Sequence, residues 1–160
     1  MKKIFYFLSL LFIITSCTED VKFNNPAFQG LKDNVFWRAS GYKANTLTNG
    51  NVIIEGDLGY EKVILKIPFT AEKTYVLGVD DVSTASYSNT FPGQLADFAT
   101  STNKGSGQIV ITDYDTENKT ISGTFKFTAL NKDATDTENS KVIFTEGVFY
   151  KIPFPSNLEY

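Results

Sequence analysis

The tightest acidic cluster in the sequence consists of Asp113, Asp115 and Glu117. Alternate carboxylates could supply the hard oxygen ligands that calcium prefers. The EF-hand pattern fails, because Asn118 stands where that loop needs glycine and Thr124 stands where it needs glutamate. Aspartate and asparagine also cap the backbone of solvated turns. We therefore favour a hairpin turn, keep calcium as the weaker alternative, and expect no cofactor.

The residue types that are missing exclude several kinds of catalysis. The chain has 160 residues and no histidine, which excludes His-based triads and His-metal sites. No Ser-x-x-Lys occurs with the further motifs that Ser-Lys hydrolases carry. Carboxylates at Asp80–Asp81 and at Asp133, Asp136 and Glu138 leave a paired-carboxylate glycosidase as the enzymatic alternative. Loop solubility explains these carboxylates better.

Aromatic side chains offer another kind of site. Rings at strand ends or in loops could stack on sugar faces or anchor a protein partner. We therefore consider Trp37, Tyr87 and Phe91 as candidate ligand-binding residues. Arg38, the single arginine of the chain, is a candidate anion contact. A core position is the stronger interpretation of Trp37, whereas Tyr87 and Phe91 fall in a long segment that we expect to be a loop.

The N-terminal residues are typical of a targeting signal. Two lysines precede an apolar run over residues 4–14, which is too short for a membrane-spanning helix of roughly 20 residues. The run ends in the sequence ITSC, and Cys17 is the single cysteine of the chain. We expect residues 1–16 to be a signal peptide, and an ordinary secreted protein is the alternative.

The ITSC segment resembles the lipobox of bacterial lipoproteins, in which the cysteine is acylated and becomes the mature N-terminus. Acyl chains such as palmitate contribute about 0.8 kcal/mol per buried methylene, so two or three of them anchor a domain to a membrane. Glu19 and Asp20 resemble the surface-export signal of lipoproteins of the Bacteroidota. The sequence therefore predicts a lipid-anchored outer-membrane protein that is exposed at the cell surface, with the periplasmic face as the alternative.

The charge of the mature chain does not favour nucleic acid. Removal of Lys2 and Lys3 with the signal reduces the 15 basic residues to 13, against 18 acidic ones, which gives a formal charge of −5. No basic cluster occurs after Cys17. We expect a membrane contact through the lipid anchor and no nucleic-acid partner.

Most of the mature chain has strand patterns. Residues 120–129 alternate polar and apolar side chains with period 2, and a five-residue polar connection joins them to the β-branched segment 108–114, which predicts an antiparallel hairpin. Segments 52–57 and 62–67 predict a second hairpin. Further strands are expected at 35–40, at 73–79, within 95–101 and at 141–150, the last with a bulge near Gly147.

About eight strands and no convincing helix predict an all-β domain. We expect an antiparallel β-sandwich, with an up-and-down β-barrel as the alternative. The sandwich is favoured because segment 80–93 is long and irregular, which suits a crossing connection. The predicted organisation is a signal peptide at 1–16, a lipidated tether at 17–30 and a single domain at 31–160.

Several segments together resemble a family of small lipoproteins of the Bacteroidota that contain a domain of unknown function. These segments are FWRA at 36–39, TYVLG at 74–78, GQIVIT at 107–112, ISGTFKF at 121–127 and EGVF at 146–149. The resemblance spans most of the mature domain. It implies an extracytoplasmic, β-rich lipoprotein and brings no established active site.

These observations favour a non-enzymatic module that binds a ligand or an envelope partner, either a protein or a glycan, through one loop end. A carbohydrate-active hydrolase that uses loop carboxylates is one alternative. An accessory subunit of an envelope complex is the other, and it predicts an exposed apolar patch on one sheet.

Overall fold

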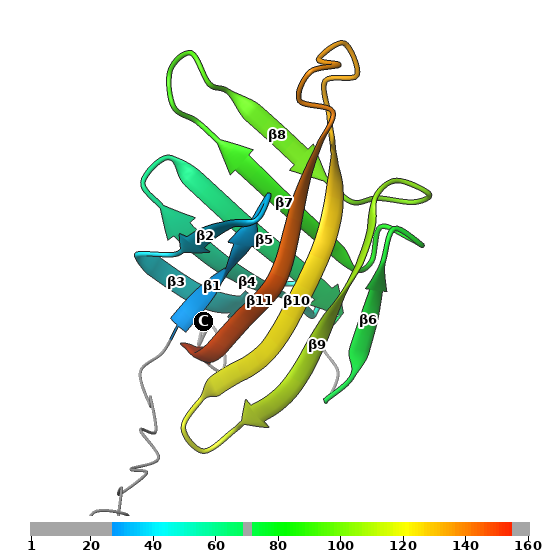
Figure 1. The fold of residues 1–160 in the computed structure, drawn as a ribbon. Helices are drawn as coiled ribbons and strands as arrows, with labels where there is room; N and C mark the ends of the chain where they lie inside the picture. The colour runs from blue at the N-terminus through cyan, green and yellow to red at the C-terminus, as the bar shows by residue number, and fades with distance from the viewer. Residues whose placement is uncertain (1–26, 69–71, 155–160) are drawn as a thin grey trace, which may run out of the picture.

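The computed structural model describes residues 27–68 and 72–154. Within these ranges the chain forms eleven strands and no helix, and neighbouring strands are antiparallel (Figure 1). The strands are β1 (Ala27–Lys32), β2 (Val35–Arg38), β3 (Gly41–Thr46), β4 (Asn51–Leu58), β5 (Glu61–Pro68), β6 (Thr74–Leu77), β7 (Thr84–Asn89), β8 (Ala96–Ala99), β9 (Ser106–Asp115), β10 (Thr120–Asn131) and β11 (Lys141–Pro153). The predicted all-β class is confirmed.

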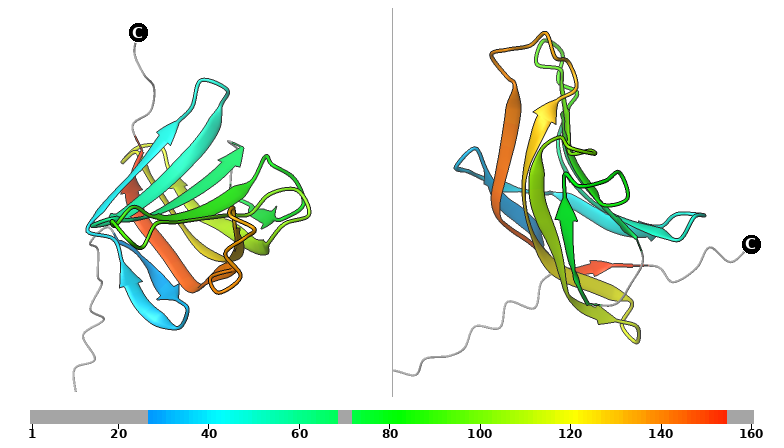
Figure 2. Two further views of the ribbon diagram at one scale, coloured as in Figure 1. Left: turned by 90° about the horizontal axis from the view of Figure 1, so that it is seen from above. Right: turned by 90° about the vertical axis from the view of Figure 1, so that its right-hand side faces the viewer.

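The strands belong to one curled sheet. Its order is β2-β1-β11-β10-β8-β7-β5-β4-β3, and β9 and β6 branch from β10. Strand β10 pairs with β9 over Thr120–Thr128 and with β8 only at Leu130 and Asn131. The sheet therefore divides at β10 into a first half (β2, β1, β11, β10, β9 and β6) and a second half (β8, β7, β5, β4 and β3). The two halves fold over each other as the layers of a sandwich (Figure 2).

The core lies between the two halves and is rich in phenylalanine. In β4 and β5 every second side chain is buried, as the period of a strand with one covered face requires. In the first half, Phe28, Phe125, Phe144 and Phe149 are buried against one another. Phe28 also packs on Gly56 of the second half, where a Cβ atom would lie 2.7 Å from the ring. The absence of a side chain at Gly56 thus allows the two layers to approach.

Two bulges bend β11. Glu146 and Lys151 adopt left-handed backbone conformations with φ of 51° and 48°. Near Glu146 the register of β11 shifts against both β1 and β10, and near Lys151 it shifts against β10. Because each bulge inserts one residue, Phe144, Phe149 and Ile152 all reach the core despite their uneven spacing. The bulge predicted near Gly147 is confirmed.

Both predicted hairpins are confirmed, as the β9–β10 and β4–β5 pairs. Three strands, β1, β3 and β7, lie outside the predicted set. The interpretation of 80–93 as irregular is wrong, because Thr84–Asn89 is β7 and pairs with both β5 and β8. The predicted tether boundary at residue 30 is also too late, because the chain is already in β1 at Ala27.

The predicted signal peptide and Cys17 lie outside the described residues. In the described part of the chain, no helix is long and apolar enough to cross a membrane.

The contact between Phe28 and Gly56 yields a stability prediction. Gly56→Ala would force a methyl group into the Phe28 ring, so we expect the free energy of unfolding to fall by about 1–3 kcal/mol in a urea titration. Gly41→Ala is the matched control, since Gly41 lies on the neighbouring strand β3 and a Cβ there meets no atom within 4 Å. Equal stability of the two variants would contradict this account of the layer spacing.

Candidate functional site

Four connections gather at one end of the sandwich, which we call the loop end. They are the β1–β2 turn, the β4–β5 turn, the β7–β8 loop and the β10–β11 loop. Strand pairing places these connections side by side. Lys32 at the end of β1 pairs with Phe144 near the start of β11, and Glu61 at the start of β5 pairs with Asn89 at the end of β7. Ala27 pairs with Tyr150, further from this end. The chain therefore enters β1 from the opposite end of the domain.

Four polar groups connect the two halves of the sheet near the loop end, and we call them the polar clasp: Lys32, Trp37, Glu61 and Tyr87. Lys32 Nζ donates to Glu61 Oε1 at 2.8 Å and to the Tyr87 hydroxyl at 2.9 Å. Trp37 Nε1 donates to Glu61 Oε2 at 2.6 Å. Lys32 and Trp37 belong to the first half, whereas Glu61 and Tyr87 belong to the second. The side chains of Lys32 and Glu61 are each only 24% exposed, so water screens this ion pair less than a surface pair.

The clasp changes the acidity of two of its members. Burial acts to lower the pKa of Lys32, but the hydrogen bonds to Glu61 and Tyr87 outweigh this effect, and the pKa is raised above its ordinary value of 10.5. Burial raises the pKa of Tyr87 above 10.0, although the nearby Lys32 ammonium opposes this rise. At neutral pH the clasp therefore contains a charged lysine and a neutral tyrosine.

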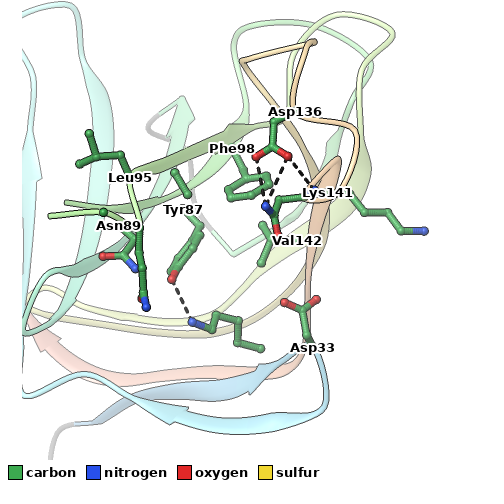
Figure 3. Close-up of a pocket in the computed structure, with 13 residues that line it drawn as sticks. Asp33, Tyr87, Asn89, Leu95, Phe98, Asp136, Lys141 and Val142 are labelled. Atoms are coloured by element: carbon green, nitrogen blue, oxygen red, sulfur yellow. Dashed lines mark hydrogen bonds between the residues drawn. The ribbon is translucent and has the colours of Figure 1, made fainter. Parts of the chain in front are cut away.

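A pocket of about 500 Å³ opens beside the clasp, and we call it the main pocket (Figure 3). Its volume lies within the range of roughly 300–1,000 Å³ that is typical of small-molecule sites. Tyr87, Phe98 and Val142 form its buried, apolar surface, and the two rings are 6.0 Å apart between centroids. Leu95 lies on the exposed rim.

Amide side chains supply hydrogen-bonding groups to the main pocket. Asn89 Oδ1 accepts from the backbone N–H of Phe91 at 2.9 Å, which leaves its side-chain NH₂ without a partner among the described residues. The Gln94 side chain also lacks a partner there, and Asn139 Oδ1 accepts no hydrogen bond within the described ranges. All three residues line the main pocket. Such groups can donate to and accept from hydroxyls.

Four charged residues line the main pocket. Lys32 and Lys141 line it together with Asp33 and Asp136. Lys32 is already paired with Glu61, and Lys141 points away from the pocket (Figure 3). Asp136 is occupied too, because both of its carboxylate oxygens accept from the Asn139 side chain. The pocket thus offers no unpaired positive charge to an anion.

A second hollow of about 470 Å³ adjoins the main pocket, and we call it the side groove. Its lining includes Leu58, Tyr60, Glu61 and Phe91. Asn89 and Gln94 line both hollows. The main pocket and the side groove are therefore neighbours that share part of their wall at the β7–β8 loop.

The structure separates the four ligand-binding candidates. Tyr87 is buried on strand β7 and lines the main pocket. Trp37 is also buried, and its hydrogen bond to Glu61 links it to the site. Phe91 is in the β7–β8 loop and lines the side groove. Arg38 is exposed on β2 and donates to Gln29 Oε1 at 2.9 Å. It lines none of the hollows at the loop end.

The acidic cluster at the β9–β10 turn has a local structural role. Asp115 Oδ1 accepts from the backbone N–H groups of Glu117 and Asn118, and Asp115 Oδ2 accepts from the Asn118 side chain. These hydrogen bonds lower the pKa of Asp115. Among the described residues, no group of three or more His, Cys, Asp or Glu side chains could hold a metal ion. Asp113, Asp115 and Glu117 are therefore not gathered into such a group in the described structure.

The other loop carboxylates also cap backbone groups. Asp80 accepts from Val82 and Ser83, and Asp81 accepts from the N–H and the hydroxyl of Thr102. Hydrogen bonds from Thr102 and Thr135 lower the pKa values of Asp81 and Asp133, respectively. A glycosidase needs a carboxylic acid with a raised pKa to protonate the leaving group. The pKa values of Asp81 and Asp133 are shifted in the opposite direction.

Several residues of the site carry no signal in the sequence. Lys32 and Glu61 lie 29 residues apart, so their pairing depends on the curl of the sheet. Asn89, Gln94 and Phe98 are separated by the segments TFPG and LAD, which follow no periodic pattern. The period-2 pattern of TASYSN in β7 was the one available signal for the inward orientation of Tyr87.

The clasp predicts a loss of stability at alkaline pH. Lys32 and Tyr87 hold their protons more tightly in the folded protein than in the unfolded chain. Their contribution to stability is therefore complete below about pH 10 and is lost as the pH rises through their folded-state pKa values. We expect Lys32→Met to lower the free energy of unfolding by about 1–3 kcal/mol at neutral pH and to flatten its decline above pH 10, both measured by urea titration.

Lys132→Met is the matched control for this experiment. Lys132 Nζ lies 2.7 Å from Asp97 Oδ2, but the two side chains are 57% and 51% exposed. Its loss should cost less than about 1 kcal/mol. Equal effects of the two substitutions would contradict the structural role of the clasp.

Comparison with curated proteins gave no match, and comparison with solved structures gave none either. The model of the family described as Domain of unknown function (DUF6252) matches residues 24–153. This range contains every described strand, from Ala27 to Pro153. The chain belongs to the DUF6252 family.

Proposed function

We propose that the protein is a lipid-anchored outer-membrane module, exposed at the cell surface, that binds a neutral saccharide in the main pocket without chemically changing it. The observation that carries this proposal is the composition of the pocket. An apolar floor of Tyr87 and Phe98 lies beside free amide groups, Lys32 is paired with Glu61, and the carboxylates of Asp33 and Asp136 already accept hydrogen bonds.

A saccharide has the chemistry that this lining complements. Its hydroxyl groups both donate and accept, as do the side chains of Asn89, Gln94 and Asn139. Its C–H groups give each ring an apolar side that fits against aromatic and aliphatic surface such as Phe98 and Leu95. An anionic ligand would meet no unpaired positive charge in the pocket, and burial of an unpaired charge is costly.

The position of the pocket is compatible with a lipid anchor at Cys17. The described chain begins at Ala27, and β1 runs from there toward the loop end. Ala27, where the described chain begins, and the main pocket therefore lie at opposite ends of β1. An anchored domain would then present the main pocket away from the membrane surface.

The binding proposal can be tested with full-length protein in detergent micelles. D-glucose, D-galactose, D-mannose and D-xylose are titrated, and binding is followed by calorimetry and by emission of Trp37, the single tryptophan of the chain. We expect at least one neutral sugar to bind. Ala96→Phe, which fills the main pocket, should weaken that binding at least tenfold, or about 1.4 kcal/mol.

Ala99→Phe is the matched control, because Ala99 lies on the same strand but lines none of the loop-end hollows. The uronic acid of the same ring provides an anionic comparator and should bind more weakly. Absence of binding by every neutral sugar, in protein with native Trp37 emission, would overturn the proposal. Equal weakening by Ala96→Phe and Ala99→Phe would overturn the assignment to the main pocket.

The anchor is tested separately. Cys17→Ser removes the thiol that acylation requires, so we expect the variant to lose its acyl groups and to leave the membrane fraction or remain unprocessed. Mass spectrometry of the N-terminal peptide and membrane fractionation measure both effects. An unchanged mass and unchanged membrane association would contradict lipidation at Cys17.

A further inference from the structure

The side groove contains an exposed aromatic pair that the core does not use. Tyr60 and Phe91 are 57% and 43% exposed, and their ring centroids lie 5.1 Å apart at an interplanar angle of 69°. Leu58 completes the apolar surface of the groove. Large apolar groups that remain exposed together commonly mark a binding surface.

Local hydrogen bonds fix the positions of both aromatic residues. The backbone N–H and the hydroxyl of Thr90 donate to the carbonyl of Tyr60 at 3.0 and 3.2 Å. The backbone N–H of Phe91 donates to Asn89 Oδ1, and the carbonyl of Phe91 accepts from the N–H of Gln94. The pair is thus held in place before any ligand binds, which lowers the entropic cost of binding.

The side groove is the neighbour of the main pocket. Asn89 and Gln94 line both hollows, so these two residues connect the aromatic pair of the groove with the Tyr87 floor of the pocket. Glu61 also lines the groove, but both of its carboxylate oxygens are occupied by Lys32 and Trp37. The groove therefore combines an apolar surface with neutral hydrogen-bonding groups, as the main pocket does.

We infer that the side groove is a second saccharide subsite and that the ligand is a neutral oligosaccharide whose chain crosses Asn89 and Gln94. One sugar ring occupies the main pocket, and a following ring stacks on the Tyr60–Phe91 pair. This inference rests on the proposed function of the main pocket and specifies the length of its ligand. Stacking on an aromatic pair contributes about 0.5–1.5 kcal/mol, which corresponds to roughly three- to tenfold in affinity.

The test is a titration of full-length protein with a sugar that binds in the main pocket and with its linear disaccharide and trisaccharide. We expect the affinity to rise roughly three- to tenfold from the monosaccharide to the longer chains. Tyr60→Ala and Phe91→Ala should remove this gain and leave the affinity for the monosaccharide unchanged. Phe36→Ala is the matched control, because Phe36 is an aromatic residue that is 62% exposed on β2 and lines neither hollow.

The outcomes separate this inference from the proposed function. If the monosaccharide binds and longer chains bind no better, the second subsite is wrong while the main pocket stands. If no sugar of any length binds, the proposed function itself fails. If Tyr60→Ala leaves oligosaccharide affinity unchanged but removes a stoichiometric protein partner from native envelopes, the groove is a protein-binding surface and the saccharide subsite is overturned.

Discussion

The hydrogen-bonded clasp of Lys32, Trp37, Glu61 and Tyr87 is the interaction on which the loop end depends. A curled sheet has backbone hydrogen bonds only between neighbouring strands, and these bonds do not hold its two layers together. Apolar packing does so in the core, where Phe28 meets Gly56. At the loop end the clasp performs this role with directional bonds of 2.6–2.9 Å. Removal of one partner would leave the others partly buried without their hydrogen bonds, so the four groups stabilise the structure as a unit.

The clasp also determines what the main pocket can bind. Within the clasp, the charge of Lys32 is paired with that of Glu61. The clasp also holds the Tyr87 ring beside Phe98. What remains for a ligand is apolar surface and the free amides of the β7–β8 and β10–β11 loops. The carboxylates of Asp33 and Asp136 keep their charge, but they already accept hydrogen bonds from the Ile143 N–H and the Asn139 side chain, respectively. A neutral polyhydroxylated ligand is the chemical class that such a lining accommodates with the fewest unpaired groups.

Elements with a strong local pattern were predictable from the sequence, and elements defined by their neighbours were not. The alternation over 120–129 determines which face of β10 is buried, whatever surrounds it. Strand β7 consists mostly of small polar residues, and pairing with β5 and β8 on both sides makes it a strand. Trp37 and Tyr87 could be selected as candidates because they are aromatic. Lys32 and Glu61 come into contact only because the sheet curls. No local pattern encodes that contact.

The most direct test of a saccharide site at the loop end is a map of amide chemical shifts in isotopically labelled full-length protein as a bound neutral sugar is added. The account predicts that the shift changes concentrate in the β7–β8 loop, including Asn89 and Gln94, and in the β10–β11 loop near Asn139. Changes confined to the β9–β10 turn or to the outer faces of the sheet would contradict it.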